Sequence, residues 1–181
     1  MIRRPPRSTP KPSSAASDVY KRQISNGIGY TFQITSIFIN LTVYENVALA
    51  IRKDNSNGEE DSVSEVLSKV GLLDRIEQRS GDLSYGHQRL LELAMGMAQK
   101  PKLLILDEPT QGLSDSEIEN FKKLIKDISS STTILLIEHN MDVVMSIADN
   151  ISVLHFGEII ADGDKETIQN DPIVQKAYLG D

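Results

Sequence analysis

The stretch that most restricts the fold is residues 103–109, in which four apolar residues are followed by two acids and a proline. A short apolar run of this kind, bounded here by Pro101 and Pro109, is typical of a strand buried on both faces of a parallel sheet. In open α/β sheets, the carboxyl ends of the strands face the crevice that binds ligands. We therefore expect Asp107 and Glu108 to lie in such a crevice, one binding a metal ion and the other positioning or deprotonating water. The alternative is a strand that simply ends at a polar turn.

Strand and helix patterns alternate along the rest of the chain. Residues 114–128 carry apolar side chains on one helical face, and residues 132–137 form a second apolar run that predicts another buried strand. This order predicts a strand–helix–strand unit with a right-handed crossover, and thus an α/β fold. A β-hairpin is expected over residues 151–161. Further helices are expected at 42–53, 61–70, 87–99, 141–148, 164–169 and 172–178.

Composition narrows the classes of function. The chain has no Cys and no Trp, so it has neither a disulfide framework nor a Cys-based metal site. No apolar run approaches the roughly 18 residues that span a bilayer. The net charge is −7, and it is unevenly distributed: residues 1–23 are basic, whereas the remainder is strongly acidic. An acidic body argues against broad nucleic-acid binding, which needs Lys and Arg to neutralise phosphates.

Residues 1–23 differ from the rest of the chain. They hold four of the seven prolines and almost no large apolar side chains, so we expect this segment to be disordered. One alternative is a basic anchor for anionic lipid, and another is a translated adapter sequence that is not native. The segment is left out of the fold prediction in either case.

Four motifs follow one another in a fixed order. Gln33 follows a predicted short strand, the loop 83–86 precedes a helix, Asp107 and Glu108 follow the central strand, and His139 follows the next strand. Each motif alone has an ordinary structural explanation. Together they resemble the ATPase subunit of ATP-binding-cassette (ABC) transporters, over about residues 24–181.

The resemblance implies a P-loop NTPase-type (RecA-like) fold with a mostly parallel sheet, and an α-helical subdomain at about residues 41–100. It assigns Gln33 to Mg²⁺ binding and to sensing the membrane partner. It assigns Ser84 and Gly86 to the signature loop, which cradles the γ-phosphate of ATP.

The same resemblance assigns roles to the residues that follow the two strands. Asp107 corresponds to the aspartate that holds Mg²⁺, and Glu108 to the catalytic glutamate that polarises the attacking water. His139 corresponds to the histidine that contacts the γ-phosphate. Residues 111–114 correspond to the D-loop, which crosses the dimer interface. The implied cofactors are ATP and Mg²⁺.

Departures from the usual motifs point to a subgroup. The signature loop has Tyr85, Gly86 and His87 where two glycines and a glutamine are usual, and Ser114 stands where the D-loop has aspartate. These variants, together with residues 41–47, 137–141 and 177–180, look like those of importers of branched-chain amino acids and related amides. A urea importer of the same subgroup and a soluble ABC ATPase of DNA repair or translation are the alternatives.

A transporter ATPase of this kind implies specific partners. These are a second ATPase subunit in a head-to-tail dimer, membrane permease subunits and, indirectly, a periplasmic or surface solute-binding protein. No nucleic acid is expected. The implied location is peripheral, at the cytoplasmic face of the membrane.

One motif of the family is missing from the sequence. The phosphate-binding loop contains Gly-Lys followed by Ser or Thr, and the 181 residues contain no Gly-Lys pair. We therefore expect the chain to be a fragment, incomplete at its N-terminus and inactive by itself, whose signature loop could still complete the site of an intact partner.

Overall fold

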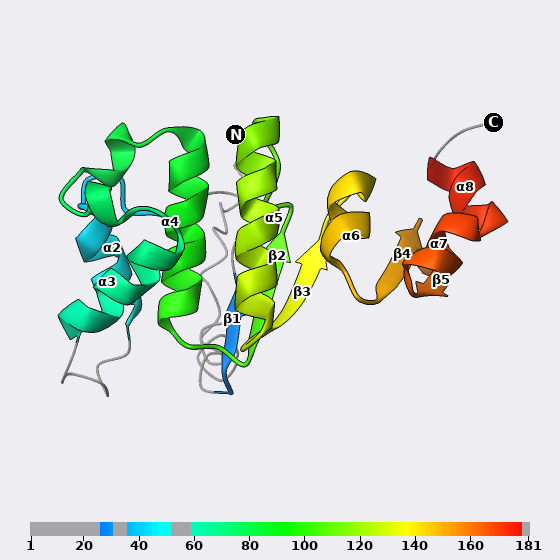
Figure 1. The fold of residues 1–181 in the computed structure, drawn as a ribbon, viewed down its shortest axis with the longest axis horizontal. Helices are drawn as coiled ribbons and strands as arrows, with labels where there is room; N and C mark the ends of the chain where they lie inside the picture. The colour runs from blue at the N-terminus through cyan, green and yellow to red at the C-terminus, as the bar shows by residue number, and fades with distance from the viewer. Residues whose placement is uncertain (1–25, 31–35, 52–58, 179–181) are drawn as a thin grey trace, which may run out of the picture.

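The computed structural model describes residues 26–30, 36–51 and 59–178 (Figure 1). The predictions for residues 1–23 and for Gln33 lie outside these described residues. Strands and helices alternate over residues 103–155, as is typical of an α/β fold. In chain order they are β1 (Ile28–Tyr30), α2 (Val43–Ala50), α3 (Glu59–Lys69), η2 (Leu73–Arg75), η3 (Ser80–Asp82), α4 (Tyr85–Ala98), β2 (Leu103–Asp107), α5 (Asp115–Ser129), β3 (Thr133–Ile137), α6 (Met141–Ile147), β4 (Ile151–His155), β5 (Glu158–Gly163), α7 (Lys165–Asn170) and α8 (Pro172–Tyr178).

The central sheet is parallel and has the strand order β1-β2-β3. Strand β2 pairs with β3 in a register that places Leu103 opposite Thr133 and Asp107 opposite Ile137. The predicted strand–helix–strand unit is confirmed, because β2 and β3 are parallel and α5 connects them. The carboxyl ends of β2 and β3 therefore meet at one edge of the sheet.

Only one face of this sheet is packed among the described residues. Leu104 and Leu106 of β2 are buried against α4 and α5, and the paired residues of β3 pack against the same core. On the other face, Leu135 and Ile137 are 50% and 47% exposed. The prediction of burial on both faces is thus wrong for β3, whereas Leu103 and Ile105 of β2 are half-buried on this face.

The helices α2, α3 and α4 form a cluster on one side of the sheet (Figure 1). The Thr42 hydroxyl accepts a hydrogen bond from the Glu45 amide at 3.1 Å, and the Glu45 carboxylate accepts one from the Thr42 amide at 2.7 Å. This capping box starts α2 where the sequence predicted it. Helix α4 begins two residues before its predicted start, because Ser84 is its N-cap and accepts from the His87 amide at 3.3 Å.

The C-terminal part has its own small core. Strands β4 and β5 form the predicted antiparallel hairpin, and α7 and α8 pack against it (Figure 1). The buried residues there are Ile151, Val153, Ile168 and Val174. Among the described residues, no helix combines the length and the apolar character needed to cross a membrane.

Candidate functional site

Glu108 lies immediately after β2, in an unusual backbone conformation. Its φ is +46°, in the left-handed region that side chains other than glycine rarely occupy. The Glu108 amide nevertheless donates to the Ile137 carbonyl at 2.9 Å, which continues the sheet by one residue. The chain therefore turns sharply at Glu108 while this residue stays attached to β3. Such strain persists where the surrounding structure holds it, and it is common at functional sites.

The structure brings Glu108 and His139 together. Nδ1 of His139 lies 3.4 Å from Oε1 of Glu108. The two side chains are 67% and 26% exposed, so the pair is open to solvent on the histidine side. They meet because each follows one of two adjacent parallel strands. Asp107 is half-buried at the end of β2, where it pairs with Ile137.

The two acids at the end of β2 are the candidate ligands of a metal ion. Among the described residues, no group of three or more His, Cys, Asp and Glu side chains could hold a metal ion by itself. Mg²⁺ is usually bound by one or two carboxylates together with phosphate oxygens and waters. Asp107 and Glu108, adjacent at the end of a buried strand, fit that donor set.

Glu138 connects the two loops that leave the sheet at this edge. Its Oε1 accepts from the Thr110 amide at 2.9 Å and from the Thr110 hydroxyl at 2.5 Å. Its Oε2 accepts from the Asn140 amide at 3.4 Å. Glu138 thereby ties the loop after Glu108 to the loop that carries His139. No pattern in the sequence predicts a role for Glu138, because its partner Thr110 is distant in the chain and no local spacing reveals the contact.

The predicted signature loop forms the N-terminus of α4. Ser84 caps the helix, and its hydroxyl also contacts Nδ1 of His87 at 2.9 Å. Gly86 is buried against α5: a Cβ at this position would lie 1.9 Å from Oε1 of Glu117. A side chain at this position would therefore displace the Glu117 carboxylate from its place. Gly86, two residues after Ser84, therefore lies against the start of α5.

Glu117 is fixed by the residue that precedes α5. Its Oε2 accepts from the Ser114 amide at 2.8 Å and from the Ser114 hydroxyl at 2.7 Å. These hydrogen bonds, with a smaller contribution from His87, hold the pKa of Glu117 below its usual value of 4.5. Glu117 thus presents a stable negative charge beside Gly86.

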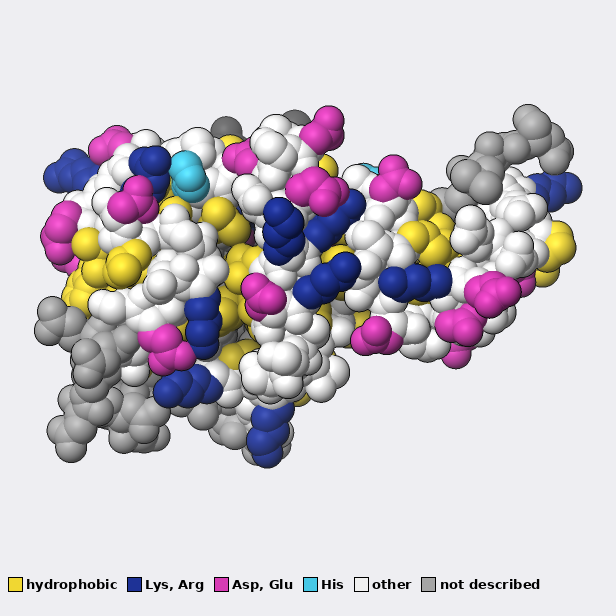
Figure 2. Space-filling model, in the orientation of Figure 1, with side chains coloured by type: hydrophobic (Ala, Val, Ile, Leu, Met, Phe, Trp, Pro, Cys, Tyr) yellow, Lys and Arg dark blue, Asp and Glu magenta, His cyan; other side chains and the backbone are white. Residues whose placement is uncertain are grey.

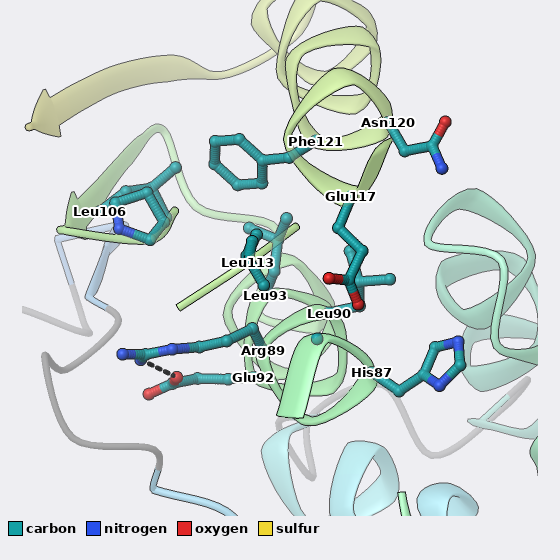
Figure 3. A pocket seen from close by; sticks show the side chains of 12 residues that line it. His87, Arg89, Leu90, Glu92, Leu93, Leu106, Leu113, Glu117, Asn120 and Phe121 are labelled. Carbon is teal, nitrogen blue, oxygen red and sulfur yellow. Dashed lines mark hydrogen bonds and ion pairs between the residues drawn. The ribbon is translucent and has the colours of Figure 1, made fainter. Parts of the chain in front are cut away.

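A pocket lies between α4 and α5. Figure 2 shows hydrophobic side chains at the bottom of the gap between these helices, and charged side chains of both signs around it. In the close view, Glu117 points across from α5 toward α4, and Arg89 lies beside Glu92 (Figure 3). The lining includes Leu90, Leu93, Leu106, Pro109, Leu113 and Phe121. The pocket is therefore lined by α4, by α5 and by the end of β2 with the loop that follows it.

The arrangement can perform two kinds of chemistry. A carboxylate and an imidazole meet at the sheet edge, where Glu108 could orient a water molecule and His139 could contact an anion. The amides at the start of α4 could bind a second anion, because a helix N-terminus favours negative charge. The two features suit the positioning and charge neutralisation that phosphoryl transfer requires.

Comparisons with known proteins agree with this chemistry. Residues 11–111 match the family model described as "ABC transporter", which covers more than half of the chain. Residues 158–181 match a model described as "Branched-chain amino acid ATP-binding cassette transporter".

Two curated relatives are ATP-binding proteins of transport systems. The chain is 36% identical to the high-affinity branched-chain amino acid transport ATP-binding protein LivG of Escherichia coli K12. It is 37% identical to the corresponding protein BraF of Pseudomonas aeruginosa. Each match covers 86% of this chain and 68% of the relative.

Solved structures have the same fold. The ADP conformation of MJ1267, an ATP-binding cassette of an ABC transporter, matches with a TM-score of 0.74 at 28% identity, over 88% of this chain and 71% of that one. CbiO1 of Clostridium perfringens, part of the ABC transporter complex cbiONQ, matches with a TM-score of 0.76 at 26% identity, over 91% and 68%. The chain belongs to the family of ATP-binding, ATP-hydrolysing ABC transporter ATPases, and its fold is the P-loop NTPase type that the sequence predicted.

Proposed function

We propose that this chain is an ATP-binding subunit that energises the import of branched-chain amino acids or related amides. It works at the cytoplasmic face of the membrane, paired head to tail with a second ATPase subunit and docked on permease subunits. The observation that carries the ATPase part is the meeting of Glu108 and His139 at the ends of β2 and β3. The solute class is supported by the match of residues 158–181 and by the names of LivG and BraF.

In this proposal Glu108 and His139 have separate tasks. The Glu108 carboxylate accepts a proton or hydrogen bond from the attacking water and so aligns it. His139 donates a hydrogen bond to the γ-phosphate, where negative charge develops. The left-handed backbone at Glu108 and the hydrogen bonds of Glu138 keep the two side chains at a fixed spacing.

Asp107, with Gln33, is proposed to bind Mg²⁺ together with the phosphate oxygens of ATP. The metal ion, when bound, neutralises negative charge on the β- and γ-phosphates. Asp107 suits this task because it is the last residue of β2, a strand that pairs with a neighbouring strand on each side. Gln33 is proposed from the motif alone.

Ser84 and Gly86 are proposed to serve the nucleotide of the opposite subunit. The Ser84 hydroxyl and the first amides of α4 would contact the γ-phosphate from the far side. Gly86 carries no side chain, and this lets the first turn of α4 lie directly against Glu117 of α5.

The proposal is tested in membrane vesicles that contain this chain, a second intact cassette subunit and permease subunits of the branched-chain amino acid class. We expect ATP-dependent uptake of labelled leucine and no uptake of labelled urea. Replacing Ser84 by Ala should lower ATP hydrolysis by about a hundredfold, as the loss of one donor to a transition-state oxyanion does in other enzymes.

A matched control separates this effect from helix capping. Asp164 caps α7 in the same way that Ser84 caps α4, since its carboxylate accepts from the Thr167 amide. Asp164→Ala should therefore cost similar stability, about 1 kcal/mol, and leave hydrolysis unchanged. Equal hydrolysis in the Ser84→Ala and Asp164→Ala complexes would contradict the assigned role of Ser84. Urea uptake in place of leucine uptake would reassign the solute.

A further inference from the structure

Three residues on one face of α4 form a chain of contacts that the proposed chemistry does not use. Tyr85, Arg89 and Glu92 are spaced four and three residues apart, which places them along the same side of a helix. Nη1 of Arg89 donates to Oε2 of Glu92 at 3.1 Å, and Figure 3 shows the two side chains next to each other. Both are almost fully buried, with 7% and 8% of the side chains exposed.

A buried ion pair of this kind is a poor source of stability, because removing two charges from water costs about as much as their attraction returns. What such a pair does provide is a fixed geometry. The guanidinium group of Arg89 is planar, and its position is set by Glu92.

Arg89 in turn holds the Tyr85 side chain. Nε of Arg89 donates to the Tyr85 hydroxyl at 3.2 Å, and its guanidinium carbon lies 5.4 Å from the centre of the Tyr85 ring. Tyr85 itself is 45% exposed, so burial alone does not fix its ring. The contacts from Arg89 therefore select the ring orientation.

The Tyr85 ring touches the loop that connects β2 to α5. Gly112 of this loop has φ +77°, and a Cβ at Gly112 would lie 2.9 Å from Cε1 of Tyr85. The ring thus packs directly on the Gly112 backbone. The loop begins at Glu108 and ends at Ser114, so its shape affects both ends of the candidate site. The amides of Gln111 and Leu113, on either side of Gly112, donate to the carbonyls of Glu108 and Thr110.

The other end of the chain of contacts reaches the segment before α2. Oε1 of Glu92 accepts a hydrogen bond from the Ser36 amide at 3.4 Å. One face of α4 therefore touches both the loop 108–114 and the segment at Ser36, which follows Gln33 in the sequence.

We infer that Arg89 is a positioning residue. Through the Tyr85 ring, which packs on Gly112, it holds the backbone of the loop 108–114 in one conformation. The relevance of this loop to hydrolysis rests on the proposed function, whereas the contact itself does not. Tyr85, at a position where the family usually has glycine, is the part of the signature loop that makes the connection.

Hydrogen exchange of the full chain without nucleotide tests this inference. In the Arg89→Met/Glu92→Met double variant, which replaces the ion pair by apolar side chains of similar size, we expect the amides of Gln111 and Leu113 to exchange about fivefold faster, the effect of losing one or two weak contacts. The amides of the β4–β5 hairpin should exchange at the wild-type rate. In the Arg89→Lys variant the amides of Gln111 and Leu113 should also exchange faster than in the wild type. A lysine cannot contact Glu92 and the Tyr85 hydroxyl in the same planar arrangement.

Two further variants make the test independent of whether the double variant folds. Tyr85→Phe removes only the hydroxyl and should raise exchange at Gln111 and Leu113 less than Tyr85→Leu, which also removes the ring from Gly112. The matched control replaces the exposed pair Glu65–Lys69 of α3 by methionines, and it should leave loop exchange unchanged.

Unchanged exchange at Gln111 and Leu113 in Tyr85→Leu would overturn the inference. So would an increase that is equal in the hairpin and in the loop, since that pattern reports general destabilisation. Because no nucleotide is present, failure of the proposed ATPase or import activity does not alter this result, and the two proposals can fail separately.

Discussion

Oε1 of Glu108 lies 3.4 Å from Nδ1 of His139, although the whole of α5 separates the two residues in the chain. Each residue follows one strand of the parallel pair β2 and β3, so the sheet register decides their meeting. Glu108 and His139 therefore lie at the carboxyl edge of the parallel sheet, which is where open α/β sheets bind their ligands.

The 181-residue polypeptide by itself should not hydrolyse ATP. Its sequence contains no Gly-Lys pair, and thus no phosphate-binding loop to hold the β- and γ-phosphates beside Glu108. The purified chain and its Glu108→Gln variant should release phosphate at the same background rate. A turnover that the substitution abolishes would show that the chain grips the nucleotide by other means.

Replacing Glu138 by Gln should destabilise the protein. The Glu138 carboxylate accepts hydrogen bonds from Thr110 with one oxygen and from Asn140 with the other. Glutamine has only one carbonyl oxygen, so its NH₂ group would face the donors of one of these two residues. We expect a loss of about 1–3 kcal/mol in the free energy of unfolding, measured in urea. Glu77→Gln, at an exposed position, is the control and should change this free energy by less than about 0.5 kcal/mol. Equal values for the two variants would contradict the bridging role of Glu138.

Asn46 is the fully buried polar residue of α2, and it binds the segments around it. Its side-chain oxygen accepts from the Phe38 amide, and the two N–H groups of its side chain are shared among the Phe38 and Thr42 carbonyls and the Ser80 hydroxyl. Asn46→Leu keeps the branched shape and the number of side-chain heavy atoms but leaves these groups without their partner, so the free energy of unfolding should fall by about 3 kcal/mol or more. Leu49→Ala, at an exposed position of the same helix, should cost less than about 0.5 kcal/mol by the same denaturant titration.

The stability contributed by Glu117 should depend on pH in a defined direction. Because the amide and hydroxyl of Ser114 lower its pKa in the folded state, this contribution is complete above the unfolded value of 4.5 and is lost as the pH falls through the lowered value. Wild type should therefore be more stable than Glu117→Gln at pH 7, and the difference should shrink below pH 4.5. Urea titrations at both pH values measure it. A difference that grows on acidification would contradict the hydrogen bonds to Ser114.

Local sequence signals located much of the fold. Thr42 and Glu45 start α2 as a capping box, and the apolar run at 103–106 forms a strand of a parallel sheet. Such features depend on residues that are neighbours in the chain, so spacing reveals them. Family motifs gave the candidate residues, of which Glu108 and His139 prove to be adjacent, while Gln33 is still a prediction.

The sequence by itself determined the order of strands and helices, their caps, and which side chains end the strands, because these follow from local periodicity and hydrogen bonding. Tertiary structure alone decided which distant groups meet. Glu138 binds Thr110 only because β2 and β3 are neighbours, and Tyr85 reaches Gly112 only because α4 packs beside α5. The tertiary structure also decided that Leu135 is exposed, although the apolar sequence of its strand predicts burial. Burial depends on which elements cover a face of the sheet and not only on the residues that form it.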